Sequence, residues 1–377
     1  MNRYIKNAAF IIICLAAVGI MWNQSHSEIR QETEESVDSS ETAVQEVTFP
    51  GEYQQEVNRV FSIDAKVVIP EDFNPNQLCR ASAKIYELDI EKWKSRFLTG
   101  TEIFDVDPEG GMSREGDDLL RELYQTEGEG NLYLSSQEGF YYDAGRYLPI
   151  NSGLEFHENK GTADHFSETA ELENISRSDA WNGLMKELDA LGIHTDDFQV
   201  QYAYALDYET LGQKEQEMLQ EEYIEPEETK GSWTSEDNAY YYCLLQKDQG
   251  LPVFYPEEVM EYEEDIYFGA VMSYYGASGL IGLNVNYLFD ITDGKEKIYL
   301  APFETITDTL IKKYEQVIMD SEITVTEFRL FQYPLRRGKD TYEIIPVWIC
   351  KLEYKDSDSV MYIPIHAVTG EEMLEME

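Results

Sequence analysis

The sequence is poor in basic side chains. Its 377 residues include 29 Lys and Arg against 74 Asp and Glu, which gives a formal net charge of -45 at pH 7. A protein with so negative a field repels phosphate backbones and anionic lipid headgroups. This charge argues against nucleic-acid binding and directs attention to proteins or small ligands as partners.

Cysteine is also scarce. The four cysteines, Cys14, Cys79, Cys243 and Cys350, form no CxxC or zinc-finger spacing. The last three are more than 100 residues apart, which is not the pattern of a disulfide framework. We interpret Cys243 and Cys350 as small buried side chains within strands.

The usual catalytic motifs are missing. Ser278 lies in Gly-Ala-Ser-Gly, which lacks the Gly-x-Ser-x-Gly elbow, and Gly276, Gly279 and Gly282 do not match the dinucleotide pattern. No pair among the five histidines has HExxH spacing; they are His26, His157, His165, His194 and His366. The sequence therefore predicts no catalytic residue, no metal ligand and no cofactor.

One acidic segment resembles a calcium loop in part. Carboxylates occupy its positions 1, 3 and 5 at Asp105, Asp107 and Glu109, and Gly110 follows at position 6. Position 12 is Gly116, so the ligand that closes such a loop is absent, and we interpret the segment as a solvated acidic turn. A hydrolase with two facing carboxylates stays open as an alternative, because 73 acidic residues from position 31 onward allow many such pairs.

The chain has one uncharged apolar run, Ala8 to Trp22, preceded by Arg3 and Lys6. Its 15 residues would form about 22 Å of helix, which nearly spans a bilayer when the flanking residues are added. We predict a membrane segment over residues 1–24, with the bulk of the chain outside the cytoplasm by the positive-inside rule. A cleaved signal peptide is the main alternative, and lipidation at Cys14 is a third.

Residues 25–55 are rich in Ser, Glu, Gln and Thr, a composition that predicts an acidic disordered tether. An N-terminal α+β domain is expected over 56–232 and a second α+β domain over 233–377. The boundary is placed after the charged stretch 213–231, which we interpret as an exposed helix and a linker.

The expected elements of the first domain follow from apolar periodicity. We predict a strand over 59–69, helices over 89–98 and 117–125, a tyrosine-rich hairpin over 131–142, a helix from the N-cap Ser178 to Leu191, and a strand over 198–204.

The second domain reads mainly as strands. We predict strands over 240–246, 266–275 and 281–291, a turn at Asp293-Gly294, a helix from Phe303 to about Val317, and three closing strands over 323–333, 342–354 and 360–366. Trp348 is expected to anchor a central strand. The fold class predicted is α+β, with two lobes of antiparallel sheet and helices packed on one face, preceded by one membrane helix.

The C-terminal strands also resemble a known family. Ile345-Pro346-Val347-Trp348, followed by Tyr362-Ile363-Pro364-Ile365-His366-Ala367-Val368-Thr369-Gly370, is similar to the closing hairpin of PepSY modules, with His366 where that motif has Asp. Over about residues 175–377 the layout resembles YycH/YycI-like membrane-anchored regulators of Gram-positive bacteria. The resemblance implies a binding or regulatory role and supplies no catalytic residue.

We therefore expect a non-enzymatic, membrane-anchored extracytoplasmic protein that binds another membrane or cell-envelope protein, with modulation of an envelope signalling system as its expected role. The alternative is a sugar- or peptide-binding protein that uses its tyrosines as stacking surfaces; these are Tyr141, Tyr142, Tyr240, Tyr241, Tyr274 and Tyr275.

Overall fold

The computed structural model describes residues 48–107, 121–126, 130–135, 139–145, 165–222, 224–254, 261–262, 270–286, 288–315, 321–338, 341–357 and 360–373. The predicted membrane segment and the first part of the predicted tether lie outside these residues. Within the described ranges, every helix is too short or too polar to cross a membrane.

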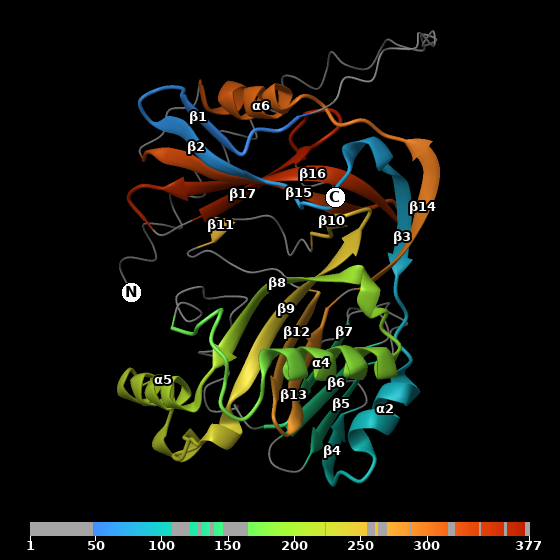
Figure 1. Cartoon of the computed structure of the whole chain (residues 1–377), viewed down its shortest axis with the longest axis vertical. Coiled ribbons are helices and arrows are strands. Elements are labelled where there is room, and N and C mark those ends of the chain that lie inside the picture. Colours follow the sequence, from blue (N-terminus) through green and yellow to red (C-terminus); the bar gives the residue numbers. More distant parts are fainter. Residues whose placement is uncertain are drawn as a thin grey trace. The chain divides into compact units, whose positions relative to one another are not determined.

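The fold is α+β, as predicted, and has two sheets (Figure 1). In the described part of the chain the first sheet has eight strands in the order β1-β2-β15-β16-β17-β11, with β3 joining β16 to β14. Its strands are β1 (Glu52–Glu56), β2 (Phe61–Val68), β3 (Cys79–Ile85), β11 (Glu261–Tyr262), β14 (Phe289–Lys297), β15 (Ile323–Arg336), β16 (Tyr342–Tyr354) and β17 (Val360–His366). All pairs are antiparallel except β2 with β15.

Among the described residues, the second sheet has nine strands in the order β10-β9-β12-β13-β7-β6-β5-β4, with β8 also paired to β9. Its strands are β4 (Ile103–Asp107), β5 (Arg121–Thr126), β6 (Gly130–Ser135), β7 (Gly139–Asp143), β8 (Phe198–Leu206), β9 (Ala239–Asp248), β10 (Leu251–Pro252), β12 (Val271–Gly276) and β13 (Gly279–Val285). All of its pairs are antiparallel.

Four α-helices complete the layers in the described residues: α2 (Ile90–Leu98), α4 (Arg177–Leu191), α5 (Tyr208–Gln220) and α6 (Phe303–Glu315). Helix α6 covers the first sheet, while α2 and α4 share a core with Tyr240 and Tyr242 of the second. Helix α5 shares a core with Tyr241 and Cys243. Because successive side chains of a strand point to opposite faces, α5 lies on the other face of the second sheet.

Short 3-10 turns connect these elements at η1 (Pro75–Gln77), η4 (Thr195–Asp197), η5 (Pro226–Glu228) and η6 (Ser235–Asp237).

Several predicted features are confirmed. The helix at 90–98, the tyrosine-rich hairpin, α6 and the three closing strands are present at the predicted places. Trp348 is fully buried in β16 between Leu330 of β15 and Ile365 of β17. Cys243 and Cys350 are buried, as predicted. Their strands supply apolar surface to both faces of a sheet, as the continuous apolar runs predicted.

Two local predictions were wrong. Residues 121–126 form strand β5 rather than part of a helix, because pairing with β4 and β6 overrides the helix propensity of the Glu and Leu residues. The N-cap of α4 is Ser176 rather than Ser178, since the Ser176 hydroxyl accepts the Asp179 backbone N–H at 3.0 Å.

The tether also ends earlier than composition predicted. Strand β1 begins at Glu52, inside the predicted tether of residues 25–55, and pairs with β2. The Tyr53 ring packs edge-on against Phe303 of α6 at 5.6 Å.

The single strand predicted at 281–291 was wrong, because this segment is divided between the two sheets. Strand β13 of the second sheet ends at Val285, and β14 of the first sheet begins at Phe289. The predicted turn at Asp293-Gly294 is absent, because β14 continues to Lys297 beside β3. Gly294 allows this pairing, since a Cβ there would lie 2.7 Å from the Arg80 carbonyl oxygen.

The two sheets are built from interleaved segments of one compact unit, Val47–Glu377. The boundary predicted at 232–233 falls between β8 and β9, which pair with each other over Phe198–Leu206. Strands from both sides of that boundary enter each sheet.

Side-chain amides join β9 and its following turn to the first sheet. The Gln246 amide accepts the Phe289 N–H at 3.0 Å and donates to the Phe289 carbonyl. Gln249 does the same for Cys79, accepting its N–H at 2.7 Å and donating to its carbonyl at 3.1 Å. Each glutamine thus takes the place of a neighbouring peptide group, at the two ends of the β3–β14 pair.

Gln246→Met should destabilise the protein by about 2 to 4 kcal/mol, because the buried N–H and C=O of Phe289 would each lose a partner at a cost of roughly 1–3 kcal/mol. Urea unfolding measures this, with the exposed Gln213→Met as control. A shift no larger than that of the control would contradict the bridging role.

Gly294→Ala should cost roughly 1–3 kcal/mol, since the added methyl group must displace backbone of β3. Gly51→Ala is the matched control, because no atom lies within 4 Å of its Cβ position. Equal thermal melting of the two variants would refute the close approach of β3 and β14.

Candidate functional site

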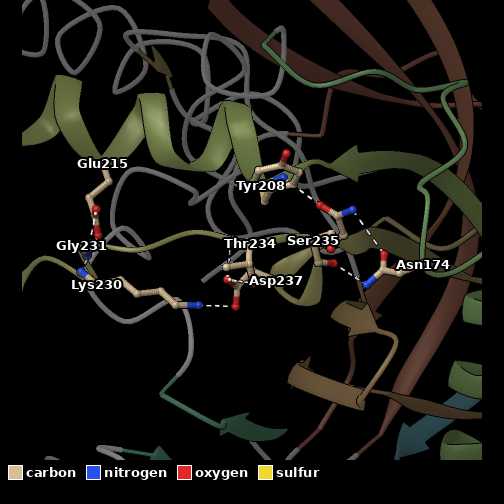
Figure 2. A network of polar contacts seen from close by, with 9 residues as sticks. Asn174, Tyr208, Glu215, Lys230, Gly231, Thr234, Ser235 and Asp237 are labelled. Carbon is tan, nitrogen blue, oxygen red and sulfur yellow. Dashed lines mark hydrogen bonds and ion pairs between the residues drawn. The ribbon is translucent and has the colours of Figure 1, made fainter.

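A network of polar side chains joins α5 to the loop that leads into β9 (Figure 2). The helix begins at the N-cap Asp207, whose carboxylate accepts the Thr210 N–H at 2.9 Å. Leu211, Glu215 and Met218 recur at helical spacing and are buried. Glu215 therefore lies on the core side of α5, where an apolar side chain would be expected.

Glu215 is 1% exposed and binds the backbone of the loop. Its carboxylate accepts the N–H groups of Lys230 and Gly231, the second at 3.3 Å. Gly231 has φ 74°, a conformation that favours glycine and aims successive N–H groups at one anion. The helix thus supplies its own anion to a backbone cradle in the loop, and we call this contact the Glu215 clamp.

A partly buried ion pair lies beside this contact. The Lys230 ammonium binds the Asp237 carboxylate and lies 4.5 Å from the centre of the Trp233 ring. Asp237, which is 5% exposed, also accepts the Thr234 N–H at 2.9 Å. These contacts hold both charges in structural roles.

Asn238 and Asn174 extend the network toward α4. The Asn238 side chain accepts the Tyr208 N–H at 2.8 Å and donates to the Asn174 side chain at 3.3 Å. Asn174 in turn donates to the Ser235 carbonyl. The loop before α4, the start of α5 and η6 are thereby tied together.

The outward side of this clamp is acidic. Its exposed carboxylates are Glu209, Glu217, Glu221, Glu222, Glu225, Glu227, Glu228 and Glu236, which we call the α5 acidic surface. The nearby lysines are engaged internally, Lys214 with Glu217 at 2.8 Å and Lys230 with Asp237. The sequence predicts the charge of this stretch, but the burial of Glu215 was not predicted. Its position four residues after the buried Leu211 is the signal that could have indicated this burial.

The local contacts of the hairpin formed by β16 and β17 explain its proline and glycine positions. Pro346 lies just past the last β16–β17 pair, Val347 with His366, so its missing N–H leaves no gap in the ladder. The Pro346 carbonyl accepts the Ala367 N–H at 2.9 Å. Gly370 has φ 75°, and its carbonyl accepts the Thr309 hydroxyl of α6 at 2.6 Å.

His366 replaces the Asp of the motif and does a similar task. Its Nδ1 accepts the Val368 N–H at 3.1 Å, as an Asp oxygen does two residues before a turn N–H. Burial lowers the pKa of His366, which keeps the ring neutral and Nδ1 able to accept. Glu343 and Glu371 oppose this pKa shift, while Arg337 adds to it.

The tyrosines proposed as stacking surfaces lie mostly in the core. Tyr240 and Tyr241 are buried, and Tyr142, Tyr274 and Tyr275 are partly buried. Tyr141 is the most open of the six at 36% exposure, and its hydroxyl donates to Asp143. The β-propensity of Tyr accounts for these positions.

The cysteine thiols are held in their neutral form. Burial raises the pKa of Cys243 to about 12, and burial also raises the pKa of Cys350 well above its ordinary value. A thiolate is the reactive form of cysteine, so both side chains act as packing groups.

The remaining sequence candidates do not converge. Asp105 and Asp107 belong to β4, and Glu109 and Gly116 lie outside the described residues, as do His26 and His157. His165 and His194 are exposed, and Gly276 and Gly279 flank the turn between β12 and β13. In the part of the chain that the structure describes, no three His, Cys, Asp or Glu residues are grouped as metal ligands.

Glu215→Gln should destabilise the protein by about 1–3 kcal/mol, because an amide NH₂ would face one of the two backbone N–H groups. Glu221→Gln removes an exposed carboxylate just past the end of the same helix and is the control. Urea unfolding that shifts equally for both variants would contradict the clamp.

His366 should make the protein less stable as the pH falls. Its folded pKa lies below the ordinary 6.5, so below about pH 6.5 the unfolded chain takes up a proton that the folded ring resists. Its contribution should therefore be complete above about pH 7 and decline as the pH falls below the ordinary pKa of 6.5. His366→Asn keeps an acceptor for Val368 without a titrating ring, and its melting temperature should change less over this range; identical pH profiles would be inconsistent with this role.

Comparisons with known proteins show a shared fold and no family. No family model and no curated protein matches the chain. A crystal structure of an uncharacterized protein from Eubacterium rectale ATCC 33656 is 16% identical, covers 87% of this chain and 94% of its own, and superposes with a TM-score of 0.58. The Bacillus megaterium YpeB C-terminal domain is 13% identical over 77% of this chain and 96% of its own, with a TM-score of 0.30, too low to argue for a family. The chain shares its fold with the Eubacterium rectale protein.

Proposed function

We propose that this chain is a non-enzymatic, membrane-anchored extracytoplasmic protein that acts by binding a second protein of the cell envelope, where it would modulate an envelope signalling system. The main support for this proposal is that side chains capable of chemistry form contacts within the fold itself. Glu215 binds backbone, and Lys230 and Asp237 bind each other.

The other chemically capable groups support the same proposal. The thiols of Cys243 and Cys350 are buried and neutral, and the His366 ring accepts a turn N–H. Active sites instead direct perturbed groups toward a substrate-accessible cleft. Function by surface contact fits this arrangement better than function by chemistry.

The surface best suited to contact is the α5 acidic surface. The Glu215 clamp and the Lys230–Asp237 pair fix the loop that carries most of its carboxylates, so little ordering entropy would be lost on binding. Negative charge of this density favours a partner with a basic patch, through steering and register more than through affinity.

The anchoring part of the proposal depends on the sequence. Arg3 and Lys6 precede the apolar run Ala8 to Trp22, which would tether the domain to the outer face of the membrane. A membrane partner would then meet the domain at a high effective concentration.

The test is quantitative crosslinking and immunoprecipitation of the full chain from detergent-solubilised membranes. The surface variant replaces Glu221, Glu222 and Glu227 by Gln, and the control variant replaces Glu52, Glu71 and Glu102, which are also exposed, by Gln. One envelope protein should be enriched by the wild type and the control, and about tenfold less by the surface variant, in a salt-sensitive manner. Enrichment of no protein by the wild type, or equal recovery with the surface variant, would overturn the proposal.

A further inference from the structure

Two buried polar atoms of the neighbouring strands β15 and β16 lack hydrogen-bond partners in the described part of the chain. They are the Trp348 indole N–H and the Gln332 side-chain oxygen, whose residues are 0% and 1% exposed. One is a donor and the other is an acceptor. A buried polar atom without a partner costs free energy, so two complementary ones on one sheet face require an explanation.

The strand register brings these two residues together. Leu330 lies opposite Trp348 and Gln332 lies opposite Pro346, with no bulge between these pairs. Trp348 and Gln332 are therefore diagonal neighbours on the same face of β15 and β16, at a separation of roughly 7 Å between Cα atoms, which long side chains span.

The orientation of the Gln332 amide is fixed by its second contact. Its nitrogen donates to the Asp248 carboxylate at 3.2 Å. A flipped amide would place its oxygen against that carboxylate, which is unfavourable. The oxygen is therefore the amide atom that faces away from the Asp248 carboxylate.

We infer that Trp348 and Gln332 form a small internal binding site for one neutral molecule that both accepts and donates a hydrogen bond, namely a single ordered water. The indole N–H repels a cation, and the amide oxygen repels an anion. A water molecule accepts from Trp348 and donates to Gln332, and two such polar partners are enough to hold it in a core.

A competing arrangement would satisfy the indole without water. The Phe49 and Phe303 rings lie 5.4 Å and 5.3 Å from the Trp348 ring, both edge to face, and an N–H can point at an aromatic ring. That arrangement leaves the Gln332 oxygen unpartnered and predicts no coupling between Trp348 and Gln332.

The test is NMR of the full chain with ¹⁵N-labelled indole groups. The Trp348 signal, identified by its loss in Trp348→Phe, should show a cross-peak to long-lived water that disappears in Gln332→Met. Trp93 is the internal control, because its indole is equally buried in a different core beside Phe140. Its signal should be unaffected by Gln332→Met.

A second measurement keeps the inference testable if the spectra are crowded. In a double-mutant cycle, Trp348→Phe and Gln332→Met should be coupled by about tenfold in the unfolding equilibrium constant, because each single change strands the other residue's water contact. Additive effects, or a Trp348 water cross-peak that persists in Gln332→Met, would overturn the site.

Discussion

The pairing of buried backbone groups around β9 is the constraint on which the rest of the structure depends. This strand is buried on both faces, with α2 and α4 on one side and α5 on the other. At its end the chain turns into β10, which pairs back with β9, while the neighbouring strands β3 and β14 belong to the first sheet. Gln246 and Gln249 supply the missing peptide-like partners to Phe289 and Cys79, so the two sheets meet without orphaned N–H or C=O groups at these residues.

A buried charged side chain also pairs with backbone groups. A chain with this excess of carboxylates buries Glu215 on the core side of α5 and uses it to organise the loop that carries many of the others. The buried carboxylate thus sets the conformation of an exposed acidic surface. We infer from this arrangement that Glu215 and the Lys230–Asp237 pair hold the α5 acidic surface in one conformation. We propose that a partner protein would bind that surface.

Much of the secondary structure could be predicted, because local signals were strong. Asp89 caps α2, Gly192 ends α4 in a left-handed conformation, and the closing strands are apolar runs that polar turns separate. The change of sheet between Val285 and Phe289 could not be predicted, since alternation continues across it and does not reveal the pairing partner. The Glu215 clamp could not be predicted either, because a charged stretch of helix usually faces solvent. At position 366 the sequence has His where the resembled motif has Asp, yet the hydrogen-bond acceptor is kept. The His366 Nδ1 accepts the Val368 N–H as an Asp oxygen would.

We expect the two interleaved sheets to unfold as one cooperative unit, because the β9 junction joins them. Differential scanning calorimetry of the full chain measures this. We predict a single transition whose calorimetric and van't Hoff enthalpies agree, as for one unit that unfolds all at once. Two separable transitions, or a van't Hoff enthalpy well below the calorimetric value, would show that the sheets unfold independently and would contradict the account.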